Sequence, residues 1–273
     1  MLDNLTEELV KRVIKKCPDQ VIGILSFDTT INEWIIYEYN NFILKEKRKE
    51  NKRRIKIRKK FNNGRIIIIL ESPHVDEFEK KFIGPALGET GKQIDDKFVS
   101  KFNNFLQANK TNVNLKYKKY EIILMNSIQY ETSLGCVTNI YRDRVWLTLW
   151  SNKSIRRSFR RRIKKYEADI IINLCTNGSH EYEPIIPEKK LINFRFIDAI
   201  NLGMKQDIYG NLKLTDNIIF DRKYTSGSSL SGKKYKLKYF TQTLLDSLKL
   251  NTINIEDNHP SCWGRIDSNF KLL

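Results

Sequence analysis

Three residues with chemically useful side chains stand just after short apolar runs of this sequence. Glu71 follows one run, Asn126 a second and His259 a third. A carboxylate can position water or stabilise a developing cation, and an imidazole can donate a hydrogen bond to a leaving group. An amide offers one donor and one acceptor group to a polar heterocycle. Each also has a structural interpretation, as a helix cap, a structural histidine or a buried turn amide, and these alternatives stay open.

These side chains need a sheet that brings several strand ends together. Apolar runs predict four strands, at residues 66–70, 122–125, 170–174 and, more weakly, 252–255. The first run is Ile-Ile-Ile-Ile-Leu, typical of a central strand buried on both faces. Helix-like segments alternate with the strands, at residues 91–106, 145–165 and 236–248. This alternation predicts a mainly parallel sheet, in which the working residues lie beyond the carboxyl ends of the strands.

We therefore predict an α/β fold: a three-layer α/β/α arrangement around a central, mainly parallel, four-stranded sheet. Residues 1–60 carry apolar residues at helical spacing and predict a helical N-terminal extension. Residues 61–273 then form the α/β domain. Within it, residues 183–235 combine two plausible strands with a Ser/Gly-rich loop, and we treat them as an insertion.

The composition excludes several classes of protein. A chain of 273 residues that is 40% hydrophobic can bury a core, so it is not a disordered polycation. No apolar run is long enough to span a membrane, and the acidic N-terminus lacks the apolar region of a signal peptide. The four cysteines are widely spaced without a Cys-x-x-Cys pair, which argues against a disulfide framework or a thiolate metal site. We expect a cytoplasmic protein without membrane contact.

Positive charge is the strongest compositional signal. The chain has 49 Lys and Arg against 32 Asp and Glu, a net charge of +17, which favours an anionic partner. An AT-biased genome also raises lysine content, so clustering must decide between the two explanations. Residues 45–60 hold eleven Lys or Arg, and residues 151–165 hold eight with no carboxylate. We expect the second segment to bind DNA phosphates, through Arg156, Arg157, Arg160 and Arg161.

Four short blocks, in this order, resemble motifs of the uracil-DNA glycosylase superfamily. Residues 70–74 read Leu-Glu-Ser-Pro-His, in the frame of the family's Gly-Glu-Ala-Pro-Gly motif. Residues 85–91 read Pro-Ala-Leu-Gly-Glu-Thr-Gly, similar to its Pro-Phe-Val-Gly-x-Ala-Gly segment. Asn126 and the His-Pro-Ser of residues 259–261 match the other two blocks. The ordered set is more specific than any single block.

The resemblance implies a DNA glycosylase, which flips out a base and hydrolyses its bond to the sugar, leaving an abasic site. It implies that Glu71 is the carboxylate near the sugar and His259 the group facing the leaving base. It also implies that Asn126 reads the base. The chemistry agrees, since the reaction builds positive charge on the sugar and negative charge on the base. The other base-binding candidates are Ser72, His74 and Ala86.

Two departures from the family concern the size of the base. Ala86 stands where the family has a stacking Phe, and His74 where it has Gly or a size-limiting Tyr. The loss of these rings leaves space in the pocket, so we predict that the site accepts a base bulkier than uracil, such as a substituted cytosine in phage DNA. Such a substrate in turn predicts a role in antiviral defence. The other substrate considered is uracil in DNA, whose release would serve DNA repair. The cysteines lack the iron–sulfur ligand pattern of the nearest-looking branch, so we expect no cofactor and no metal.

The resemblance also implies that a loop after His259 wedges into DNA, with Cys262, Trp263 and Arg265 as wedge candidates and Ser261 as a further DNA contact, although Trp263 could instead be core. The expected partner is therefore DNA, bound by a monomer. Two alternatives remain. A metal-dependent nuclease could use Glu71 with Asp76, Glu77 and Glu79, and a non-catalytic nucleic-acid-binding module could share the fold.

Overall fold

The computed structural model describes a set of ranges that covers most of the α/β core. They are residues 16–39, 63–74, 77, 83–132, 146, 149–150, 153–178, 237–265 and 268–273. The basic segment 45–60, the predicted insertion 183–235 and the nuclease candidates Asp76 and Glu79 lie outside these residues. The predictions made for them stay predictions.

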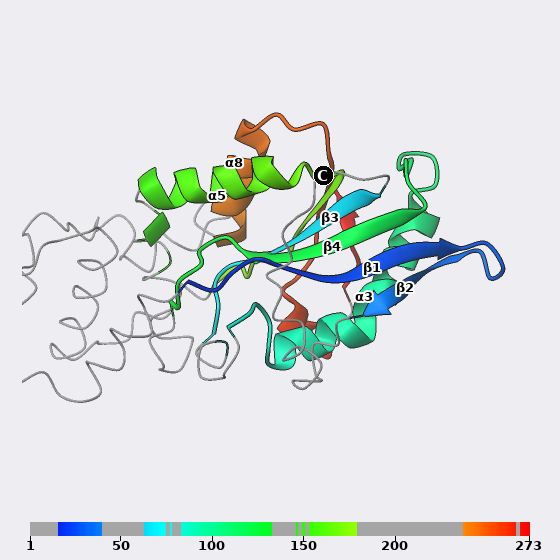
Figure 1. Cartoon of the computed structure of the whole chain (residues 1–273), viewed down its shortest axis with the longest axis horizontal. Helices are drawn as coiled ribbons and strands as arrows, with labels where there is room; N and C mark the ends of the chain where they lie inside the picture. The colour runs from blue at the N-terminus through cyan, green and yellow to red at the C-terminus, as the bar shows by residue number, and fades with distance from the viewer. Residues whose placement is uncertain are drawn as a thin grey trace, which may run out of the picture.

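A single seven-stranded sheet forms the centre of the structure (Figure 1). Its strands are β1 (Gln20–Asp28), β2 (Glu33–Tyr39), β3 (Gly64–Leu70), β4 (Lys119–Asn126), β5 (Ile170–Asn173), β6 (Ile253–Glu256) and β7 (Lys271–Leu272). They are ordered β2-β1-β4-β3-β5-β6-β7. Strands β4, β3, β5 and β6 are parallel to one another, whereas β1, β2 and β7 pair antiparallel to their neighbours.

The structure confirms the α/β class and corrects the sheet. The four predicted strands are its parallel centre, but the sheet is mixed and has seven strands, so a four-stranded sheet is wrong as a description of the whole. The helical prediction for residues 1–60 is wrong over residues 20–39, which form the β1–β2 hairpin and pair with β4. Register shifts between Val21 and Gly23 and between Ile24 and Leu25 break the strict alternation that would have marked β1 as a strand.

Helices cover both faces of the sheet (Figure 1). They are α3 (Glu89–Ala108), α5 (Lys153–Tyr166) and α8 (Leu237–Ser247), and a short 3-10 helix, η4 (Pro260–Cys262), follows β6. Along β3, Ile66 and Ile68 pack with the phenylalanines of α3, whereas Ile67 and Ile69 pack with α5 and α8. Because successive strand residues point to opposite faces, a strand covered on both sides is apolar throughout.

The described helices also bear on membrane insertion. None of those within the described ranges is both long and apolar enough to cross a bilayer.

Candidate active site

The parallel centre of the sheet brings the predicted residues to one edge. Leu70, the last residue of β3, pairs in register with Asn126, the last residue of β4. Glu71 therefore leaves the sheet beside Asn126, and its neighbour Ser127 donates a backbone hydrogen bond to Leu70 O (2.7 Å). His259 follows β6, which is separated from β4 in the sheet by β3 and β5.

Glu71 and His259 meet at this edge. The Nε2 atom of His259 lies 3.4 Å from Oε2 of Glu71, and the two side chains are only 14% and 6% exposed. The backbone N–H of Ser261 donates to Nδ1 of His259 (3.3 Å). Since Nδ1 accepts this bond, the proton of a neutral imidazole lies on Nε2 and points at the carboxylate. The predicted donor and the predicted carboxylate thus face each other.

The carboxylate is held from two sides. Its Oε2 accepts the backbone N–H of Thr176 (3.3 Å), at the end of β5. The backbone carbonyl of Glu71 accepts hydrogen bonds from Ser127 Oγ (2.7 Å) and from the indole Nε1 of Trp146 (3.0 Å). Contacts from three parts of the chain therefore fix Glu71, as expected of a group that must be positioned before a substrate arrives.

Asn126 belongs to a buried polar chain that was not foreseen. Its Nδ2 donates to Sγ of Cys17 (3.7 Å), and the Cys17 thiol lies 3.7 Å from Oε2 of Glu77. Oε1 of Glu77 accepts the backbone N–H of Ala86 (2.9 Å). Oδ1 of Asn126 is buried and has no hydrogen-bond partner among the described residues. An acceptor in this state costs free energy unless a ligand supplies the missing donor.

Burial changes the acid–base behaviour of this chain. It raises the pKa of Glu77 to about 8, although hydrogen bonds from the backbone of Ala86 and His74 oppose the shift. Burial also raises the pKa of the Cys17 thiol, and the negative charge of Glu77 adds to the effect. At neutral pH the protonated forms of both groups are therefore favoured, which avoids a second buried negative charge near Glu71.

A buried lysine completes the surroundings of the site. Lys238, the second residue of α8, donates through Nζ to the backbone oxygen of Asp257, two residues before His259. Its side chain is mostly buried, and burial lowers its pKa. Asn173 Nδ2 in turn donates to the backbone oxygen of Lys238 (3.3 Å). These bonds tie α8 to the β5 and β6 ends from which the site is built.

The remaining base-binding candidates differ in their surroundings. Ser72 shares a 2.6 Å hydrogen bond with Thr132, and His74 is exposed. Ala86 is fully buried in the core beneath α3 and adopts a left-handed φ of 53°. That conformation is strained for alanine, and the Glu77 carboxyl, which holds its N–H, compensates for it. The alanine methyl is therefore covered by the surrounding core, and its contact with a base stays a prediction.

No family model, curated protein sequence or solved structure matches this chain. The site must therefore be interpreted from its own residues.

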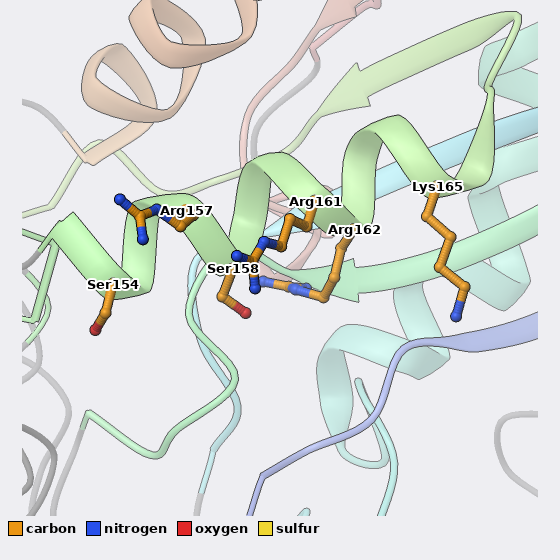
Figure 2. Close-up of a pocket in the computed structure, with 6 residues that line it drawn as sticks. All are labelled: Ser154, Arg157, Ser158, Arg161, Arg162 and Lys165. Atoms are coloured by element: carbon orange, nitrogen blue, oxygen red, sulfur yellow. The ribbon is translucent and has the colours of Figure 1, made fainter.

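Helix α5 carries the predicted phosphate-binding surface. Its buried face consists of Ile155, Phe159, Ile163 and Tyr166. Arg157, Arg160 and Arg161 are exposed, whereas Arg156 is half-buried and bonded to the backbone oxygen of Trp150. A depression of about 320 Å³ lies along this helix, and Figure 2 shows the side chains that line it. It is lined by Ser154, Arg157, Ser158, Arg161, Arg162 and Lys165.

Arg162 has a different role from its exposed neighbours. Its guanidinium donates to the backbone oxygens of Asn126 (2.8 Å) and Ser127 (2.9 Å). It also forms a 2.8 Å ion pair with the buried carboxylate of Asp19, which accepts a hydrogen bond from Tyr166 (2.6 Å). Arg162 thus joins the basic helix to the strand end that carries Asn126, and the count of charges in the sequence could not distinguish it from the other arginines.

The predicted wedge residues differ in their exposure. Trp263 is 4% exposed, packs against Phe270 and donates through its indole to Asn258 O (3.0 Å), so it is a core residue in this structure, which is the second of its two interpretations, and its contact with DNA stays a prediction. Ser261 and Cys262 are half-buried, and Ser261 is bonded to His259. Arg265 is exposed, so of these residues its side chain is the most available to DNA.

Cys17, Glu77, Arg162 and Lys238 are the residues that sequence reasoning missed or assigned to other roles. Cys17 stood in a segment interpreted as helix, and Glu77 was considered only as a nuclease ligand. Lys238 lies in a segment predicted as helix, and no sequence signal gave it a role.

Proposed function

We propose that this protein is a DNA glycosylase that hydrolyses the bond between a flipped-out base and its sugar. The observation that carries the proposal is the buried pair of Glu71 and His259, 3.4 Å apart at the edge where β3 and β6 end. Asn126 ends the neighbouring strand β4, and its amide oxygen has no partner among the described residues. A carboxylate, a hydrogen-bond donor and a base-reading amide are the groups that this hydrolysis requires.

The reaction assigns one task to each group. A base that enters the site takes the Nε2–H bond of His259 in place of Glu71, and its carbonyl oxygen becomes the acceptor. Glu71 is then free to accept a proton from water. The C1′–N bond breaks with its electron pair leaving on the base, the water oxygen bonds to C1′, and the proton held by Glu71 finally returns to the released base. His259 stabilises the negative charge of the departing base throughout.

Phosphate contacts supply affinity but no chemistry in this scheme. The exposed Arg157 and Arg161 line the depression of Figure 2 together with Arg162 and Lys165. Since Arg162 connects this helix to Asn126, DNA held on α5 lies next to the strand end that would read the base. The same proposal includes a three-layer, glycosylase-like fold. It also includes the substrate, a bulky modified pyrimidine or uracil, and a role in phage defence or in repair.

The test is release of a free base. Oligonucleotides that each contain one uracil or one 5-substituted cytosine are incubated with the protein, abasic sites are revealed by alkaline cleavage, and the released base is identified by mass spectrometry. We expect Glu71→Gln to lower the rate by at least about 100-fold. Glu33→Gln is the matched control, since Glu33 is exposed at the start of β2.

The two alternatives give other results. Strand cleavage that needs a divalent metal and proceeds without an abasic site favours the nuclease. Glu77, one of its candidate ligands, is instead buried and bonded to Ala86. Tight DNA binding that survives both Glu71→Gln and His259→Ala, without any base release by the wild type, favours the non-catalytic binding module.

A further inference from the structure

The amide of Asn126 is held in one orientation by a neighbour from another part of the chain. Cys17 precedes β1, and its Sγ lies 3.7 Å from Nδ2 of Asn126. The same thiol donates toward Oε2 of Glu77. With its only proton directed at Glu77, the sulfur can serve Asn126 only as an acceptor. The amide N–H therefore points at Cys17, and the amide oxygen points away from it.

This direction requires Oε2 of Glu77 to be an acceptor. The backbone N–H of Ala86, which can only donate, takes Oε1, and the Cys17 thiol donates to Oε2. A neutral Glu77 meets the requirement with its own proton on Oε1. Glu77 and Cys17 are both at most 5% exposed, so water does not compete for these contacts. We call these contacts, which hold the amide of Asn126 in one orientation, the amide lock. The amide lock is buried, since Asn126 itself is 1% exposed.

The amide lock leaves one group for a ligand. Oδ1 of Asn126 has no partner among the described residues, and Asn126 adjoins the backbone of Glu71 through the pairing of β3 with β4. A buried acceptor of this kind is satisfied by a ligand that brings a donor and is repelled by one that brings a second acceptor.

We infer that Cys17 and Glu77 set the specificity of this site, by presenting Asn126 as an acceptor only and thereby selecting a base whose edge carries an exocyclic amino group. A cytosine-type base places N4–H against Oδ1. A uracil-type base places the O4 oxygen there, and the amide nitrogen that would pair with O4 is occupied by Cys17. The inference rests on the proposed function, because it names the substrate class of the same site.

The test compares two bases that differ only at this edge. Single-stranded oligonucleotides carry one 5-hydroxymethylcytosine or one 5-hydroxymethyluracil in the same sequence, so that the substituent at C5 is identical. Release rates are measured for the wild type. Binding is measured with Glu71→Gln, at a salt concentration that suppresses contacts to phosphate. We expect the amino base to be preferred by at least about tenfold in both measurements, since one unmatched buried acceptor costs about that much in discrimination.

Two substitutions at one position test the amide lock itself. Cys17→Ser keeps an acceptor for Nδ2 and is expected to retain the preference. Cys17→Val keeps the volume but removes the acceptor, which frees the amide to turn, so the ratio between the two bases is expected to fall toward one. Because the readout is a ratio within each variant, a loss of stability does not imitate the effect.

Other outcomes separate the two claims. Equal or faster release of the uracil-type base by the wild type overturns the inference while leaving the glycosylase proposal intact, and so does an unchanged ratio in Cys17→Val. Release of neither base, together with no release from the uracil and other modified oligonucleotides used to test the proposed function, overturns the glycosylase proposal, and the binding ratio of Glu71→Gln then still decides the inference.

Discussion

Nε2 of His259 lies 3.4 Å from Oε2 of Glu71, although Glu71 precedes strand β5 in the sequence and His259 follows it. Each side chain orients the other, because the Nε2 proton has the carboxylate as its acceptor. Groups that act as a unit give substitutions that are not additive.

This pairing predicts the outcome of a double-mutant cycle. Glu71→Gln and His259→Asn should each lower base release by at least about 100-fold, and the double variant should be no slower than the slower single variant. Rates are measured under single-turnover conditions, so that product release does not mask the chemical step. Losses that multiply in the double variant would show that the two residues act independently, against the account given above.

Substitutions of Arg161 and Arg162, which are adjacent on α5, should differ in their effect on stability. Arg162→Met removes the partner of buried Asp19 and the donors to Asn126 O and Ser127 O, so we expect a loss of about 3–5 kcal/mol in stability. Arg161 is exposed, and Arg161→Met should leave the melting temperature unchanged. Thermal unfolding of both variants checks this, and a stable Arg162→Met protein would contradict the role assigned to Arg162.

The exposed arginines should also determine the salt dependence of DNA binding. Each phosphate contact that is lost lowers the slope of log affinity against log salt by about 0.9, so Arg157→Met and Arg161→Met should each reduce the slope by about this amount. Binding titrations over a range of salt concentrations measure it. An unchanged slope in both variants would mean that DNA does not lie along α5.

Glu77 predicts a pH dependence of stability. Burial raises its pKa from 4.5 to about 8, so the folded state holds a proton that the unfolded state releases between these values. The contribution of Glu77 to the free energy of unfolding is therefore greatest below about pH 4.5. This contribution falls by about 2–4 kcal/mol as the pH rises toward 8. Glu77→Gln keeps an acceptor for Ala86 N–H and should flatten this part of the profile. Denaturant unfolding at pH 5 and pH 8 gives the comparison, and parallel profiles would contradict it.

The elements that could be predicted from sequence are those whose local pattern matches their final environment. Strands β3, β4 and β5 are buried along most of their length, so a simple apolar run marked each of them. Strand β6, in which Ile255 alone is fully buried, gave the weaker signal. Strand β1 was missed because two register shifts disrupt its alternation, and the pairing with β4 that stabilises it is distant in sequence. Local propensity carries no information about such a partner.

The candidate site divides in the same way. Glu71, Asn126 and His259 could be proposed because each follows a recognisable strand. Cys17 and Glu77 could not, since their importance comes from contacts between residues 17, 77 and 126 that only the fold creates. Trp263 had two interpretations from sequence, as a DNA contact after the His-Pro-Ser block or as core, and its contacts with Phe270 and Lys101, which are distant in sequence, make it part of the core in this structure.

Trp263 and Arg265 provide a test of where the core ends. Trp263→Ala should lower stability by about 3–5 kcal/mol, because a buried indole is lost and its contacts leave a cavity. Arg265→Ala should leave stability within about 0.5 kcal/mol of the wild type and weaken DNA binding instead. Chemical unfolding and binding titrations on the same preparations measure both. A stable Trp263→Ala protein with weakened binding would restore Trp263 as a DNA contact.

The most direct test of the central claim is mass spectrometry of the bases released from modified DNA by the wild type and by Glu71→Gln. The account predicts that the wild type liberates a free base and leaves an alkali-sensitive abasic site, and that Glu71→Gln does so at least about 100-fold more slowly, while the Glu33→Gln control matches the wild type. Equal release by the wild type and Glu71→Gln, or no free base from any of the modified DNAs, would contradict it.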